Sequence, residues 1–310
     1  MKKVAFIFPG QGSQSFGMGK DFFDNSEIAK EMIKKASDRL NIDFEKLLFE
    51  ENEKLSETKY TQPAILLVSS IANAIFKDRC DVKPEFLLGH SLGEFSALVS
   101  AGGLDYLDAI ELVYKRGEFM TEACSNGGAG MMALVGIDDK TVEDICEAQR
   151  KEGKQVWPAN YNQDGQLVLA GIKADLESLV DTFKQAGAKR AIVLNMSVAS
   201  HCELLTSAIE NLKPYLEEYI KDQFLPVISN VTAKEYTTKD EAIELLSLQL
   251  ISPVKYKQSI LANVEKIDAF IEFGNGVVLK GLNRKICKGT PTLNVSDMAS
   301  LEKVINEVNC

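Results

Sequence analysis

The residues best suited to chemistry lie in the stretch FLLGHSLGEFSALVSAGG, residues 86–103. Ser91 stands between Gly89 and Gly93 in a GxSxG pattern, after an apolar run that predicts a strand ending at Leu88 and before an apolar run that predicts a helix. A serine on such a turn projects its hydroxyl, the glycines avoid clashes where strand and helix pass, and the helix N-terminus favours a developing oxyanion. We therefore predict that Ser91 is a nucleophile; the alternative is a serine that caps the helix.

A nucleophilic serine needs a neighbouring base to take its proton, and the chain contains two histidines. His90 adjoins Ser91, and adjacent residues on a sharp turn point in different directions, so His90 is badly placed as the base. His201, in SVASHCELL, follows at a predicted strand-to-helix junction, as in other folds with this serine motif. We predict that His201 is the base; the alternative is a hydrogen-bonded core histidine. None of the 45 acidic residues stands in a setting that marks it as the third member of a triad.

Arg116 lies at the end of a predicted amphipathic helix in LDYLDAIELVYKRG. It continues the apolar stripe of that helix, three residues after Val113. Because an unpaired buried charge is very costly, one interpretation is a bidentate site for a substrate carboxylate near Ser91. The alternative is a frayed last turn from which Arg116 reaches solvent.

A glycine-rich loop follows the first apolar run, in VAFIFPGQGSQSFGMGK, residues 4–20. A dinucleotide-binding GxGxxG template starting at Gly10 would need glycine where Ser15 stands. A phosphate-binding GxxxxGK[ST] template over residues 14–21 would need glycine where Gln14 stands. Both templates fail, and the pattern instead predicts a strand over residues 3–8 followed by a turn whose backbone approaches another group closely.

The elements that must position these residues alternate between short apolar runs and amphipathic segments, which is typical of an α/β protein with a parallel sheet. One segment, residues 127–196, departs from this alternation. Its pattern predicts strands over residues 130–136, 155–161, 166–171 and 190–194 and helices over residues 139–152 and 175–186. This β-α-β-β-α-β order indicates an inserted ferredoxin-like domain over residues 127–196, within a large domain formed by residues 1–126 and 197–310.

Composition excludes several classes of protein. Apolar residues make up 45% and charged residues 26% of the 310 residues, and no apolar run approaches the roughly 20 residues of a membrane-spanning helix. The formal net charge of -10 argues against a nucleic-acid partner. The apolar stretch of MKKVAFIF is too short for a secretory signal, and the six scattered cysteines indicate reduced thiols rather than disulfides or a zinc site. We expect a cytoplasmic protein.

Several motifs occur in order along the chain: FPGQGSQ, YTQPAIL, GHSLGE, YKRG, SVASH, LQLISPVKY and EFGNGVVLKGL. Together they resemble the malonyl-CoA:acyl carrier protein transacylases of fatty-acid synthesis, essentially from end to end. The resemblance implies a large domain similar to α/β-hydrolases that carries a ferredoxin-like small domain. It also implies ping-pong transfer of malonyl from malonyl-CoA to the phosphopantetheine thiol of acyl carrier protein, with no metal or other cofactor.

The resemblance carries roles over to individual residues. Ser91 matches the serine that becomes malonylated and His201 the base, while Arg116 matches the arginine that binds the malonyl carboxylate. Next to the nucleophile, His90 is assigned to substrate binding together with Arg116.

Three further residues acquire roles from the same resemblance. Gln11 and Leu92 match the residues whose backbone N–H groups form the oxyanion hole, which implies that the glycine-rich loop approaches an acyl carbonyl rather than a phosphate. Gln249 matches the glutamine whose carbonyl orients the histidine in place of a triad carboxylate.

The implied partner, acyl carrier protein, is expected to be acidic like this chain, so repulsion must be overcome locally. We expect Lys280, Arg284 and Lys285 to line the docking surface, with Lys189 and Arg190 as a second group; the alternative is an ordinary solvated helix face. A thioesterase or lipase, a silent binding module, and a stand-alone acyltransferase of a polyketide synthase are the rival functions. We expect a monomer.

Overall fold

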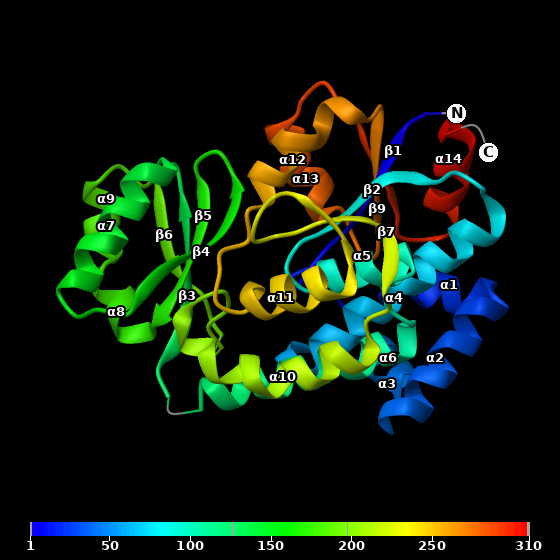
Figure 1. Ribbon diagram of the computed structural model, residues 1–310, viewed down its shortest axis with the longest axis horizontal. Helices are drawn as coiled ribbons and strands as arrows, with labels where there is room; N and C mark the ends of the chain where they lie inside the picture. Colours follow the sequence, from blue (N-terminus) through cyan, green and yellow to red (C-terminus); the bar gives the residue numbers. More distant parts are fainter. Residues whose placement is uncertain (1, 126, 197, 309–310) are drawn as a thin grey trace.

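The computed structural model describes residues 2–125, 127–196 and 198–308, and within them two separate sheets form (Figure 1). The larger sheet has the order β10-β9-β1-β2-β7-β8. Its strands are β1 (Val4–Phe8), β2 (Pro84–Gly89), β7 (Gln223–Ile228), β8 (Glu235–Thr238), β9 (Ala269–Phe273) and β10 (Thr292–Val295). Neighbours pair in parallel except β7 and β8, which are antiparallel. The predicted α/β class with a parallel sheet is confirmed, with an antiparallel edge strand that we did not expect.

Strand β1 shows why this sheet lies at the centre of the large unit. All five of its residues are buried. Val4, Phe6 and Phe8 belong to the core cluster on one face, whereas Ala5 and Ile7 belong to the cluster on the other. Since side chains alternate along a strand, a continuous apolar run is what a sheet covered by helices on both faces requires.

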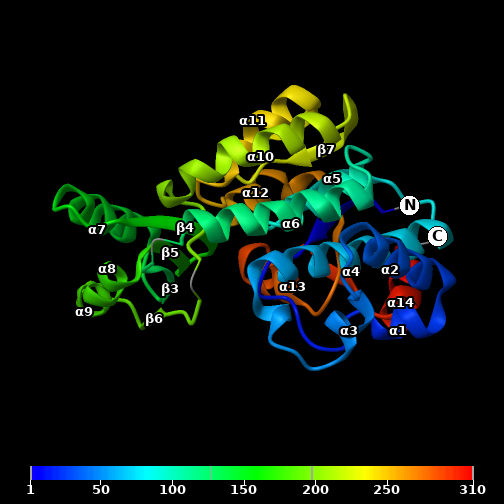
Figure 2. The same cartoon turned by 90° about the horizontal axis from the view of Figure 1, so that it is seen from below.

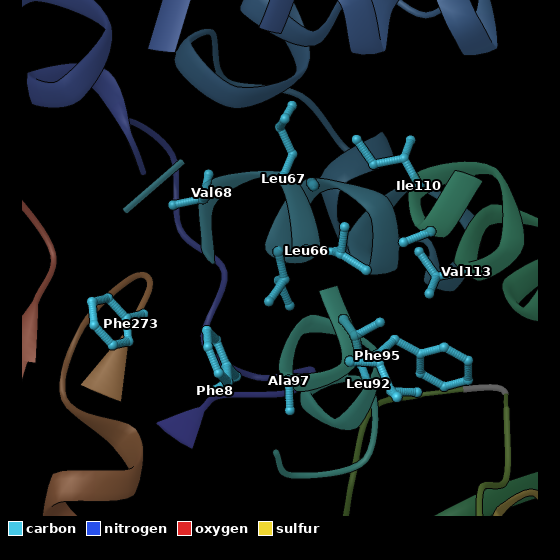
Figure 3. Packing of buried hydrophobic residues seen from close by; sticks show 14 of the residues in the cluster. Phe8, Leu66, Leu67, Val68, Leu92, Phe95, Ala97, Ile110, Val113 and Phe273 are labelled. Carbon is cyan, nitrogen blue, oxygen red and sulfur yellow. The ribbon is translucent and has the colours of Figure 1, made fainter. Parts of the chain in front are cut away.

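Helices cover both faces of this sheet. Those of the large unit are α1 (Lys20–Asn25), α2 (Glu27–Leu40), α3 (Phe44–Phe49), α4 (Thr58–Arg79), α5 (Gly93–Ala101), α6 (Tyr106–Ala123), α10 (Thr206–Tyr219), α11 (Lys239–Gln249), α12 (Tyr256–Asn263), α13 (Val278–Ile286) and α14 (Met298–Val308), with short 3₁₀ turns η1 (Lys54–Ser56), η2 (Glu203–Leu205) and η3 (Val264–Lys266). Helices α4, α5 and α6 contribute to the cluster with Phe8, and α12 and α13 to the opposite cluster. Figure 3 shows Leu66 of α4, Phe95 of α5 and Val113 of α6 close to one another in the first cluster.

The smaller sheet belongs to a second unit, which Figures 1 and 2 show at one end of the molecule. Its elements are β3 (Ala129–Val135), α7 (Asp139–Lys151), β4 (Val156–Gln163), β5 (Gln166–Ile172), α8 (Lys173–Ser178), α9 (Val180–Gln185) and β6 (Arg190–Val193). The strand order is β4-β5-β3-β6 and its pairs are antiparallel. This unit has its own apolar cluster, so the ferredoxin-like arrangement is confirmed. The domain boundaries stay a prediction, and residues 126 and 197 at these boundaries lie outside the described residues.

The helix predicted over residues 175–186 is wrong in detail. It begins at Lys173 and is divided at Leu179 into α8 and α9. The Leu179 N–H donates to the carbonyl of Leu176, three residues back, and ψ of Leu179 is -3°. Leu176, Leu179 and Phe183 all lie in the core of the small unit, as their spacing of three and four residues on one helical face predicts.

Strand β4 also joins the small unit to the large one. Val254, from the segment between α11 and α12, accepts a hydrogen bond from the Tyr161 N–H at 2.9 Å and donates one to the Ala159 carbonyl at 2.8 Å. Lys257 of α12 pairs with Asp139 at the start of α7. These contacts hold the two units together beside the carboxyl end of the large sheet.

The cysteines differ in part from the expectation of reduced thiols. Cys124, Cys146, Cys202 and Cys287 are free and buried. Cys80 is disulfide-bonded, so the prediction is wrong at this residue, and Cys310 lies outside the described residues. Across the described ranges, no helix is long and apolar enough to cross a membrane.

Candidate active site

The carboxyl ends of three neighbouring strands supply the candidate site. Gln11 follows β1, Ser91 follows β2, and Asn230 follows β7. Parallel strands present their carboxyl ends at one edge of the sheet, where open α/β sheets bind ligands. Gln11, Ser91 and Asn230, which lie 80 to 219 positions apart in the chain, can therefore meet at this edge of the sheet.

The turn at Ser91 has the strained geometry that the GxSxG pattern predicts. Ser91 has φ of 53°, a left-handed conformation that is uncommon for a residue with a side chain. A Cβ at Gly89 would lie 1.8 Å from the Gly93 carbonyl carbon, and a Cβ at Gly93 would lie 2.1 Å from the Phe8 carbonyl oxygen. Both positions therefore require glycine, because the strand and the helix pass with their backbones in contact.

Ser91 and His201 form a hydrogen-bonded pair. The Ser91 Oγ lies 2.7 Å from His201 Nε2, and His201 Nδ1 lies 2.7 Å from the backbone carbonyl oxygen of Gln249. A carbonyl oxygen can only accept, so Nδ1 carries the proton of the neutral ring and Nε2 is left to accept the hydroxyl proton of Ser91. The pair is therefore arranged for proton transfer from the serine to the histidine.

The surroundings of His201 favour its neutral form. The residue is 2% exposed and has φ of 62°. Burial, and secondly the positive charge of Arg116, lower its pKa to about 3. The imidazole is consequently unprotonated, as a base must be, over the physiological pH range.

His90 lies beside the pair without joining it. Its Nε2 is 2.8 Å from Asn162 Oδ1 in β4, and its ring packs against Tyr256 with 5.5 Å between ring centroids. Burial lowers its pKa. The side chain thus bridges the two units at the cavity wall, which is compatible with contact to a substrate.

Arg116 is buried, which rules out the alternative that it reaches solvent. The residue is 2% exposed, in the interior face of α6. Its guanidinium donates to Gln62 Oε1 at 2.8 Å and to Gln249 Oε1 at 3.1 Å, and it lies over the ring of Phe95 at 5.4 Å. Burial lowers its pKa to about 10, so it stays charged at neutral pH. Its Nε has no hydrogen-bond partner among the described residues.

Gln249, the last residue of α11, connects the reacting pair with Arg116. Its backbone carbonyl accepts from His201, and its side-chain oxygen accepts from Arg116. Its side-chain nitrogen donates to the Ser91 carbonyl at 3.2 Å and to Glu94 Oε2 at 2.7 Å. The resemblance assigned a role to the carbonyl that faces the histidine; the structure adds a second carbonyl that faces the arginine.

The two residues expected to form an oxyanion hole line the same cavity as Ser91. Leu92 is the first residue after the serine, directly before α5, and Gln11 belongs to the glycine-rich loop. Gly10 in this loop packs against the turn, since a Cβ there would lie 2.2 Å from the His90 carbonyl oxygen. Close packing of the loop on the turn is thus the reason for glycine at position 10, in line with the predicted close approach of this backbone to another group.

Sequence reasoning missed two buried residues under the turn. Asn230 accepts from the Ser91 N–H at 2.7 Å and donates to the Gly89 carbonyl at 2.7 Å, so its side chain clamps the strained turn. Glu94 is fully buried in the first turn of α5. Glu94 could have been found within the GHSLGE motif, whereas the sequence carries no signal for Asn230 beyond its place after a strand.

A cavity of about 460 Å³ brings these groups together between the two units. Ser91, His201 and Arg116 line it with Gln11 and Leu92 from the large unit. Further lining residues are Asn160, Asn162, Gln166 and Val168 of the small sheet and Val278, Leu279 and Leu282 of α13. Its wall is therefore formed by both units. Separately, the described residues contain no cluster of side chains suited to a metal ion.

The basic residues expected at the docking surface fall into two separate places. Lys280, Arg284 and Lys285 are exposed on α13, whose first residues line the cavity. Lys189 and Arg190 are exposed where β6 begins, whereas the nearest residue in the chain that lines the cavity, Leu194, comes directly after the last residue of this strand. Only the α13 group lies on an element that borders the cavity.

Comparisons with known proteins agree with this arrangement. The model of the acyl transferase domain family matches residues 5–301. The malonyl CoA-acyl carrier protein transacylase of Bacillus subtilis (strain 168) is 42% identical over 308 residues, with 98% of this chain and 97% of the relative covered. The transacylase of the same name from Haemophilus influenzae is 40% identical, with 98% of each chain covered.

Solved structures give the same result. The malonyl-CoA:acyl carrier protein transacylase of Helicobacter pylori has a TM-score of 0.96 and 44% identity, with 99% of each chain covered. A malonyl-transacylase solved in complex with its type II polyketide synthase acyl-carrier protein has a TM-score of 0.95 and 35% identity, with 98% of this chain and 99% of that chain covered. The two-domain fold is thus shared over nearly the whole chain.

Proposed function

This chain belongs to the acyl transferase domain family, and on that premise we propose that it transfers malonyl from malonyl-CoA to the phosphopantetheine thiol of acyl carrier protein through an ester on Ser91. It is an acyltransferase. One observation carries the proposal: the Ser91–His201 pair opens into the same cavity as a buried arginine whose two hydrogen-bond partners there are neutral amides.

The first half-reaction loads the enzyme. Ser91 Oγ attacks the thioester carbonyl carbon while its proton passes to His201 Nε2. The C–S bond then breaks, the proton moves from His201 to the departing sulfur, and free coenzyme A leaves a malonyl ester on Ser91. The carbonyl of Gln249 holds the ring in the required tautomer and accepts from Nδ1 while the imidazolium exists.

The oxyanion of each tetrahedral intermediate accepts hydrogen bonds from the backbone N–H groups of Gln11 and Leu92. Donors of this kind typically contribute about 2.7–4 kcal/mol each to the transition state. Helix α5 begins directly after Leu92, so the positive end of its dipole adds to the same stabilisation. Asn230 keeps this geometry by accepting from the Ser91 N–H.

The second half-reaction reverses these steps with another thiol. The phosphopantetheine thiol gives its proton to His201 Nε2 and attacks the ester carbonyl carbon. The ester C–O bond breaks, and the proton passes from His201 to Ser91 Oγ. The carrier protein leaves with a malonyl thioester, and the enzyme returns to its starting state.

Arg116 selects malonyl over uncharged acyl groups. Its guanidinium offers planar N–H donors that match a carboxylate, and its buried setting makes an ion pair there stronger than in water. Held by Gln62 and Gln249, the guanidinium is oriented before the substrate arrives. His90, at the cavity wall, contributes to the same binding surface.

Intact-mass spectrometry after mixing the protein with malonyl-CoA tests the proposal, with Ser91→Ala alongside. We expect one malonyl adduct on the wild type and none on the variant, and discharge of the adduct by added acyl carrier protein. Free malonate without an adduct would instead indicate a hydrolase. Absence of both products would indicate a binding module or another acyl donor.

The carrier protein comes from fatty-acid synthesis in this proposal, with a polyketide synthase carrier as the second candidate. The solved complex of a similar malonyl-transacylase with a type II polyketide synthase carrier favours keeping the second candidate. Discharging the malonyl-enzyme with each type of carrier at equal concentration distinguishes them by rate. The exposed basic residues of α13 support this helix as the docking surface for an acidic carrier. A monomer and a cytoplasmic location remain predictions.

A further inference from the structure

Glu94 is a fully buried carboxylate, three residues after the nucleophile, for which the proposed mechanism has no use. The Gln249 Nε2 and the Asn230 backbone N–H donate to its Oε2 at 2.7 and 3.1 Å. The Tyr236 hydroxyl donates to its Oε1 at 2.9 Å. A carboxylate that accepts several hydrogen bonds is stabilised in its ionised form, although burial opposes this and raises its pKa to about 7.

Arg116 is a buried charge of the opposite sign, and it too lacks a direct partner of opposite charge among the described residues. It is a buried cation, and both of its hydrogen-bond partners in the described part of the chain are neutral amides, of Gln62 and Gln249. A buried charge without compensation is strongly destabilising. A carboxylate in direct contact would compensate it, but would also occupy the guanidinium that has to bind the substrate.

The side-chain amide of Gln249 connects these two groups. Its oxygen faces Arg116 and its nitrogen faces Glu94. If the amide were turned over, its NH₂ would face the guanidinium donors and its oxygen would face the carboxylate oxygens. Arg116 and Glu94 therefore favour the same orientation of the amide, with its oxygen toward the cation and its nitrogen toward the anion.

We propose that Glu94 is the counter-ion of Arg116, held one side-chain amide away through Gln249, and is thereby a positioning residue that leaves the guanidinium free for the acyl carboxylate. The role of the acyl carboxylate rests on the proposed function. The charge coupling itself does not, because it concerns the protein without substrate. Burial lowers the pKa of Arg116 to about 10 and raises that of Glu94 to about 7, and attraction between the two charges opposes both shifts.

A double-mutant cycle in thermal unfolding tests the coupling, at pH 8 so that Glu94 is ionised. Glu94→Gln removes the charge and retains the contacts, because an amide oxygen replaces Oε2 and the new NH₂ replaces Oε1, where the Tyr236 hydroxyl can accept instead of donate. Arg116→Met removes the cation. The loss of donors to Gln62 and Gln249 occurs in both the single and the double variant and cancels in the cycle.

Each single variant leaves one buried charge uncompensated, so we expect each to lower Tm by about 5 °C or more. The double variant removes both charges. Its decrease in Tm should therefore be much smaller than the sum of the decreases in the two single variants. Tyr236→Phe is the matched control, since it removes a hydrogen bond to Glu94 but retains the charge. Its effect on Tm should add to that of Arg116→Met.

Loading with malonyl-CoA gives an independent readout. In Glu94→Gln the malonyl carboxylate supplies the missing negative charge, so malonylation should raise Tm more than it does in the wild type. Additive Tm effects in the cycle would overturn the inference and reduce Glu94 to a hydrogen-bond acceptor. If wild-type protein takes no malonyl group, the proposed function fails, while the cycle without ligand still decides the coupling.

Discussion

Two regions of one cavity differ in how they handle charge. The reacting pair, Ser91 and His201, is neutral at rest and is oriented by a neutral carbonyl rather than a carboxylate. The acyl-carboxylate pocket, around Arg116, is built on a buried charge with Glu94 one amide away. In the proposed mechanism the reacting pair serves any thioester, whereas the pocket around Arg116 distinguishes one acyl group from another. Variants of the two regions should therefore fail in different ways.

The largest effect is expected in the reacting pair. Ser91→Ala removes the atom that carries the acyl group, so transfer of malonyl and of acetyl should both fall by a factor on the order of 10⁶, as for loss of a nucleophile in a serine hydrolase. Transfer rates with radiolabelled thioesters measure this. A variant that retained either activity would show that another residue carries the acyl group.

The pocket should show a selective loss. Arg116→Ala removes the partner of the malonyl carboxylate and should weaken malonyl transfer by about 2–5 kcal/mol, the usual cost of truncating a buried charge pair. Acetyl transfer should be spared, because acetyl has no carboxylate. The ratio of kcat/KM for the two thioesters measures the selectivity. Equal losses would mean that Arg116 is structural, and the distinction between the two regions would not hold.

The pH dependence of the loading rate tests whether the reacting pair is neutral at rest. Burial lowers the pKa of His201 to about 3, so the base stays unprotonated as pH falls from 7.5 to 5.5. Formation of the malonyl-serine should then change little over this range. A histidine with the ordinary pKa of about 6.5 would be roughly 90% protonated at pH 5.5 and would lose about tenfold in rate. A tenfold loss in a stopped-flow measurement would contradict the prediction.

His201 and Glu94, one from each region, should change the free energy of unfolding in opposite directions as pH falls. The unfolded chain binds a proton at His201 below pH 6.5 that the folded protein excludes down to about 3, so this residue makes stability fall as pH falls through that window. Glu94, with a raised pKa of about 7, binds its proton first in the folded state and makes stability rise as pH falls from about 7 towards its ordinary value of 4.5. Glu272, whose pKa burial also raises to about 7, contributes with the same sign as Glu94. Replacing Glu94 by Gln should therefore make the stability measured by urea unfolding rise less, or fall more, between pH 7 and 4.5 than it does in the wild type.

The smallest effect is expected outside the cavity, on α13. Charge reversal at Arg284 and Lys285 should raise the KM for acyl carrier protein by roughly three- to tenfold, the scale of exposed charge pairs. Both regions of the cavity remain intact, so malonyl-serine formation from malonyl-CoA should be unchanged. The same reversal at Lys189 and Arg190 is the matched control, because they lie at the end of β6 away from the cavity. An unchanged KM in the α13 variant would exclude this surface.

Local patterns predicted the strained turn that carries Ser91 and the order of elements in the small unit. The turn at Ser91, its flanking glycines and the ferredoxin-like order of elements all depend on short-range backbone preferences, which a sequence displays directly. The helix over residues 175–186 was predicted as one element, whereas the structure divides it at Leu179 into α8 and α9, a local irregularity for which the sequence carries no glycine or proline signal. The disulfide at Cys80 was likewise hidden, because spacing alone does not show which thiols meet.

The amino-acid pattern alone predicted a strained turn at Ser91 and singled out His201 as the histidine that could act as its base. The surroundings of Arg116, by contrast, follow from the three-dimensional arrangement of distant segments. Its contact to Gln249 spans 133 positions, and that of Gln249 to Glu94 spans 155. Hydrogen bonds over such separations depend on how strands and helices are arranged, not on local pattern. The candidate reacting residues could therefore be predicted from the sequence, whereas the charges and amides around Arg116 could not.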